Sequence, residues 1–95
     1  MKIYLMSRYT IHKGNLEFVY GYDRPLGEYF YQIYDHDIED ADQQLIEWKS
    51  NRTDYLARDY YAEGLTLAEI ALKFNFFGVP KNVTDCVEMG LPLPE

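Results

Sequence analysis

Apolar and polar residues alternate along the first third of the chain, and this period of two predicts β-strands. The alternation runs through residues 2–12, 16–23 and 28–34. Turn-forming residues separate these stretches at 13–15 and again around Pro25, which cannot donate a hydrogen bond to a strand ladder. We therefore expect three antiparallel strands joined as consecutive hairpins.

The middle of the chain allows two interpretations. Residues 43–49 read as a fourth strand with Ile46 and Trp48 on one face, and the preceding meander favours this reading. The spacing of Ile38, Ala41, Leu45 and Trp48 also fits a helix, capped by Asp37. Residues 53–62 fit either a short helix or an irregular turn.

The last third predicts two short helices. Thr66 and Glu69 have the spacing of a capping box, followed by an apolar stripe that ends before Gly78. Pro80 opens a second helix, and Gly90 ends it. We expect an α+β fold within one domain, residues 1–95: an antiparallel sheet of three to four strands, with helices 66–77 and 80–89 packed on one face.

The composition narrows the functional classes. With 16 acidic residues against 9 basic ones, the net charge is −7, which opposes direct binding to nucleic acid. The helix pair resembles a DNA-binding helix-turn-helix, but its second helix offers only Lys81 and Asn82 against Asp85 and Glu88. No apolar run is long enough for a membrane span. The single cysteine, Cys86, excludes an internal disulfide and is typical of a reducing cytoplasm.

Catalytic and metal-binding patterns are absent from the sequence. The chain holds two histidines, one cysteine and no glycine-rich phosphate loop, so we expect neither an enzyme nor a cofactor. Cys86 lies among apolar helix residues and is predicted to be an inert part of the core. The acidic segment 35–42 lacks the spacing of a calcium loop and is predicted to be a solvated turn.

Tyrosine and phenylalanine are concentrated between Tyr20 and Tyr34, on both faces of the predicted strands. One face should pack under the helices, while a chain this short has few elements with which to bury the other. Tyrosine tolerates exposure and often anchors protein interfaces. The rings therefore form a cross-strand ladder, an interface, or both.

Two stretches, "VYGYDRPLGEYFYQIYD" and "GLTLAEIALKFNFFGVP…LPLP", resemble small uncharacterised proteins of bacteria, phages and plasmids. That resemblance covers about half of the chain and brings no activity with it. The matching positions are Tyr20, Gly21, Tyr22, Asp23, Pro25, Leu26, Tyr29, Phe30, Gly64, Leu65, Thr66, Gly78 and Val79. In size and acidity alone the chain is also similar to anti-CRISPR proteins, the counter-defence inhibitors of mobile elements.

These observations favour a small acidic protein that inhibits a larger bacterial nucleic-acid-handling or defence complex by occupying a basic groove on it. The alternative is a module that self-associates as a homodimer through a sheet edge or its aromatic face. We expect no direct contact with nucleic acid or membrane. The predicted partner-binding residues are Tyr29, Tyr31, Tyr34, Asp35, Asp37, Glu39, Asp40 and Asp42.

Overall fold

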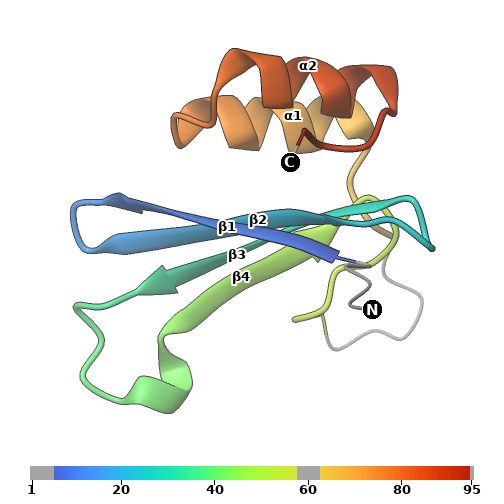
Figure 1. Cartoon of the computed structure of the whole chain (residues 1–95). Helices are drawn as coiled ribbons and strands as arrows, with labels where there is room; N and C mark the ends of the chain where they lie inside the picture. Colours follow the sequence, from blue (N-terminus) through green and yellow to red (C-terminus); the bar gives the residue numbers. More distant parts are fainter. Residues whose placement is uncertain (1–5, 58–62, 95) are drawn as a thin grey trace, which may run out of the picture.

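Two helices cover one face of a four-stranded antiparallel sheet in the computed structural model of the chain (Figure 1). The structure describes residues 6–57 and 63–94. The strands are β1 (Met6–Lys13), β2 (Leu16–Asp23), β3 (Glu28–Asp35) and β4 (Leu45–Ser50), and a short 3₁₀ turn, η1 (Ala41–Gln43), precedes β4. The helices are α1 (Leu67–Phe76) and α2 (Lys81–Met89). The α+β fold expected from the sequence is confirmed.

The sheet follows the order of the chain, β1-β2-β3-β4, so every connection is a hairpin. Gly14 and Gly27 each have a φ of 60° in the first two turns, a conformation that glycine adopts without steric cost. The strand interpretation is confirmed from residue 45 onward by β4, whereas Gln43 belongs to η1 and Gln44 caps it. The pairing between β3 and β4 shifts at Ile33 and Tyr34, where Ile46 is left out of the register as a bulge.

Aromatic rings build the core between the sheet and the helices. Tyr20 lies opposite Tyr9 on one neighbouring strand and Tyr31 on the other, and the Tyr9 and Tyr20 rings stack at 5.4 Å. Phe18 stacks on Phe77, just beyond α1, with ring centroids 4.3 Å apart. The predicted cross-strand ladder is therefore present, and it forms the floor on which the helices pack.

The capping box and the two glycines that the sequence indicated as helix boundaries have these roles in the structure. The Thr66 hydroxyl accepts from the Glu69 amide while the Glu69 carboxylate accepts from the Thr66 amide, so the capping box is complete and contributes about 1 kcal/mol. Gly78 and Gly90 have φ angles of 83° and 70° after the two helices. Cys86 is half-buried and packs against the core, as expected.

A short return segment folds back along β4. The Ser50 amide donates to the Thr53 carbonyl and the Tyr55 amide donates to the Trp48 carbonyl. Residues 53–57 thus form an irregular turn. The remainder of the 53–62 prediction, and the start of the first predicted strand at residues 2–5, lie outside the described residues.

None of the helices in residues 6–57 and 63–94 has the length and apolar character needed to cross a membrane.

Candidate binding surface

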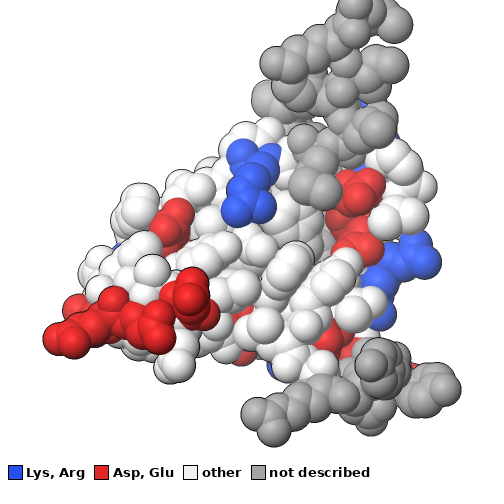
Figure 2. All heavy atoms as spheres, turned by 90° about the horizontal axis from the view of Figure 1, so that it is seen from below, with Lys and Arg blue, Asp and Glu red and all other residues white. Residues whose placement is uncertain are grey.

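The hairpin between β3 and β4 carries the predicted acidic cluster at one end of the sheet (Figure 1). Asp37, Glu39, Asp40 and Asp42 are exposed there, and Asp35 is half-buried at the end of β3. Figure 2, which looks onto the sheet face opposite the helices, shows carboxylates gathered at this corner. These five residues therefore lie together in one hairpin, and their role in binding a partner stays a prediction.

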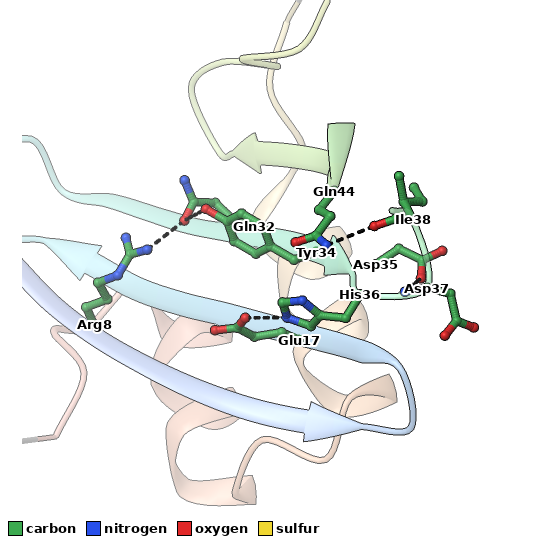
Figure 3. A network of polar contacts seen from close by, with 9 residues as sticks. All are labelled: Arg8, Glu17, Gln32, Tyr34, Asp35, His36, Asp37, Ile38 and Gln44. Carbon is green, nitrogen blue, oxygen red and sulfur yellow. Dashed lines mark hydrogen bonds and ion pairs between the residues drawn. The ribbon is translucent and has the colours of Figure 1, made fainter. Parts of the chain in front are cut away.

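Hydrogen bonds hold the acidic hairpin in shape (Figure 3). The Asp35 carboxylate accepts from the Asn15 side-chain amide at 2.6 Å and from the Asp37 backbone amide at 3.0 Å. The Asp40 carboxylate accepts from the Asp42 amide at 3.0 Å and thereby caps η1. The Gln44 side chain donates to the Ile38 carbonyl at 2.9 Å. These contacts hold the loop in one conformation, and an ordered loop loses less conformational entropy if it binds another molecule.

The acidic residues divide into two groups by what their carboxylates do. Asp35 and Asp40 accept bonds from the hairpin itself. For the carboxylates of Asp37, Glu39 and Asp42, the described residues contain no hydrogen-bond or ion-pair partner. The second group is thus able to meet cations from outside without losing a structural contact.

Two of the three predicted tyrosine anchors are not on the surface. Tyr29 and Tyr31 are 2% and 1% exposed because they face the helices. The Tyr29 hydroxyl donates to the Leu91 carbonyl, and the Tyr31 hydroxyl donates to the Glu47 carboxylate. Both are core residues in this structure, and the prediction that they anchor a partner is corrected here.

Tyr34 alone among those tyrosines lies on the open face of the sheet, where it is half-buried beside the acidic hairpin. Its hydroxyl contacts the Gln32 side-chain oxygen at 3.4 Å, and the Arg8 guanidinium donates to the same oxygen at 3.0 Å (Figure 3). Nearby, the His36 ring and the Glu17 carboxylate are 2.7 Å apart. A row of polar side chains therefore leads from the acidic hairpin onto the open face.

The open face is covered more fully than the sequence led us to expect. Val19 and Phe30 are only 2% and 6% exposed, although they point away from the helices. The ring of Phe30 lies against Gly21, and the rings of Trp48 and Tyr55 stack at 4.7 Å and 22°. The return segment supplies Tyr55 and so adds an aromatic layer to this face.

Sequence reasoning did not assign Phe30, Gln32, Trp48 and Tyr55 to a site. The alternation in β3 already placed Phe30 and Gln32 on one face, which was a signal for these two, and the pairing of Gln32 with Trp48 brings Trp48 to the same face. Tyr55 gave no such signal, because its position depends on the irregular turn after β4.

A hollow of about 400 Å³ lies between β4 and α1. Leu72 and Phe76 stand at its rim and are 70% and 63% exposed. The Lys73 ammonium and the Glu47 carboxylate, both in the lining of this hollow, form an ion pair at 3.4 Å, so their charges balance. This hollow presents apolar surface without a net charge, and it is separate from the acidic hairpin.

The described side chains hold no group of three histidine, cysteine or acidic residues that could bind a metal ion together. Comparison of the chain with protein-family models, with curated proteins and with solved structures gave no match. The surface itself must therefore carry the functional argument.

Proposed function

We propose that this chain acts by occupancy, as a small acidic inhibitor that docks its β3–β4 hairpin into a basic groove of a larger protein. The partner class we infer is a bacterial nucleic-acid-handling or defence complex, as with anti-CRISPR proteins, and the place of action is the cytoplasm. A groove that normally holds phosphates presents lysine and arginine, which the hairpin carboxylates would meet in place of the phosphates.

The observation that carries this proposal is the ordered acidic hairpin. Its backbone is fixed by internal hydrogen bonds, while Asp37, Glu39 and Asp42 remain directed at solvent. Charges presented in this way speed the encounter and orient the docking. Contact area would come from the neighbouring open face, where Tyr34 and Trp48 are half-buried.

A double charge reversal in the hairpin tests the proposal. Replacing Asp37→Lys and Glu39→Lys should weaken capture of the partner at least about tenfold, mainly by slowing association. Affinity of the unaltered chain should fall as salt rises, because exposed charges are screened over about 8 Å at physiological ionic strength. The measurement is a pull-down from bacterial lysate, followed by association kinetics with the recovered protein.

The matched control is Glu63→Lys with Glu88→Lys, two exposed acids outside the hairpin. Both double variants change the net charge from −7 by +4, to −3, so a difference between them reports position rather than total charge. Equal capture by wild type and both variants at every salt concentration would rule out the hairpin as the docking element.

Self-association is the second candidate function, and the position of β1 at the edge of the sheet favours it. β1 is an eight-residue strand at the sheet edge, and within the described part of the chain it pairs with β2 alone. Such an edge can pair with a second copy to continue the sheet. Sedimentation across a concentration series separates the candidates, since the docking proposal works with a monomer and the edge pairing requires a dimer.

A further inference from the structure

The open face of the sheet contains a hollow of about 280 Å³ at the end away from the acidic hairpin. Three aromatic side chains and two carboxylates give it its chemical character. The described residues that line it are Arg8, Asp23, Leu26, Glu28, Phe30, Gln32, Trp48 and Tyr55. The volume lies just below the range of about 300–1,000 Å³ that is typical of small-molecule pockets, so it suits one side chain better than a cofactor.

A buried carboxylate stands in the wall of this hollow. Glu28 is 6% exposed, and the Tyr55 hydroxyl donates a hydrogen bond to it at 2.5 Å. The partner that the described side chains give to the Glu28 carboxylate is thus a neutral hydroxyl. Buried charges are normally paired, because an unpaired one is costly to remove from water. A cation that entered the hollow would therefore add a favourable charge contact to this carboxylate.

Both carboxylates also lie close enough to Tyr55 to affect its pKa. Burial is the main cause that raises the pKa of Tyr55 to about 12, and the hydrogen bond and charge of Glu28, with the charge of Asp23, add to it. Arg8 is the one basic residue among the described lining residues, and its guanidinium donates to the Gln32 side-chain oxygen. The described residues of the lining therefore carry a formal charge of −1, from two acids and one base.

Aromatic rings surround the same space. Trp48 and Tyr55 stack at 4.7 Å as one wall, and Phe30, 6% exposed, lies in the sheet beside them. The faces of such rings attract cations through their quadrupoles, and tryptophan does so most strongly. Rings combined with carboxylates are the arrangement by which proteins hold ammonium and guanidinium groups.

We propose that this hollow receives a single lysine or arginine side chain from the protein partner. The proposal rests on the proposed function, since it names the group of the basic partner that the open face recognises. It places a specific contact on the same face as the acidic hairpin, so the hairpin would guide the encounter while the hollow selects one residue.

Trp48 provides the test, because it is the only tryptophan of the chain and it lines the hollow. The probe is N-acetyl-arginine methylamide, titrated at constant ionic strength while indole fluorescence is followed. The matched probe is the citrulline derivative, which has nearly the same shape without the charge. We expect saturable binding of the arginine probe in the millimolar range, and at least about tenfold weaker binding of the citrulline probe.

The companion variant is Glu28→Gln, which keeps the shape of the side chain and its ability to accept from Tyr55. It should weaken binding of the arginine probe about tenfold, whereas Glu88→Gln, the same charge change on exposed α2 surface, should leave it unchanged. If Glu28→Gln does not fold, as judged by circular dichroism, the half-buried Asp23→Asn replaces it with an expected weakening of a few-fold.

Equal binding of the arginine and citrulline probes, or no loss in the folded variant, would overturn the inference. Failure of the proposed function looks different. A chain that binds the arginine probe but captures no basic protein would keep the hollow and remove the inhibitor proposal. A chain that captures a partner through the hairpin but does not bind the arginine probe would keep the inhibitor proposal and remove the inference about the hollow.

Discussion

Replacing Gly21 by alanine is expected to destabilise the chain by at least about 3 kcal/mol, and it is the most damaging single-methyl substitution that we predict. A β-carbon at this position would lie 1.8 Å from the Ser7 backbone oxygen and 2.7 Å from the Phe30 ring. The ring could rotate away, but the backbone oxygen belongs to β1, which pairs with β2. Relief of the clash therefore requires the two strands to separate.

This loss is large compared with the stability available. At about 0.05–0.15 kcal/mol per residue, a domain of this length has about 5–14 kcal/mol in total. Urea unfolding measures the effect, with Gly14→Ala as the control. Gly14 has a φ of 60° but nothing within 4 Å of an added β-carbon, so that variant should lose only about 1–2 kcal/mol. Similar losses at both positions would contradict the steric argument.

The glycine also explains why one aromatic residue is buried on the open face. Gly21 lies directly opposite Phe30 in the register, and the phenylalanine ring covers the space left by the missing side chain. Such aromatic cover over a strand glycine is a known way to stabilise a sheet. The predicted clash of an added β-carbon and the position of the Phe30 ring over Gly21 thus have one cause, which is the close approach of β1, β2 and β3 at this point.

Local signals in the sequence were sufficient for most of the fold. The alternation of apolar and polar residues predicted the strands β1 to β3, since one face of each strand had to be buried. The capping box at Thr66 and the glycines at 78 and 90 defined the helix ends through backbone geometry. These features depend on neighbouring residues, so the sequence alone predicts them well.

The surface could be predicted only in part, because it depends on contacts between distant residues. The acidic hairpin was predicted because its residues are adjacent in the chain. The placement of Tyr29 and Tyr31 was not, because burial depends on which sheet face the helices cover, and the alternation does not say which. The hollow was missed because Tyr55 reaches Glu28 across 27 positions.

The buried tyrosines make alkaline unfolding the second large effect that we expect. Burial raises the pKa of Tyr29 to about 12, and burial together with the hydrogen bond to Glu47 raises the pKa of Tyr31 further. Burial also raises the pKa of Tyr20. In the unfolded chain these hydroxyls ionise near their ordinary pKa of about 10. The folded chain keeps its protons longer, so its stability is fully present below about pH 10 and falls above it.

Tyr29 alone should cost on the order of 2–3 kcal/mol by about pH 12, from two pKa units at about 1.4 kcal/mol each. Tyr31 is as deeply buried and should add at least as much, so the chain should unfold cooperatively between about pH 10 and pH 12. Tyr55 is 42% exposed and should contribute less, because water screens its charge. Urea unfolding at a series of pH values, with tyrosinate absorbance recorded alongside, measures this.

The Tyr29→Phe variant separates titration from packing. Near neutral pH it should be less stable than wild type, because the Leu91 carbonyl loses its donor. Between about pH 9 and pH 11 it should lose less stability than wild type, because one group that titrates only on unfolding has been removed. If the Tyr29→Phe variant and wild type lose the same stability between about pH 9 and pH 11, the Tyr29 hydroxyl does not titrate with unfolding, and its burial in the core of this sheet would be wrong.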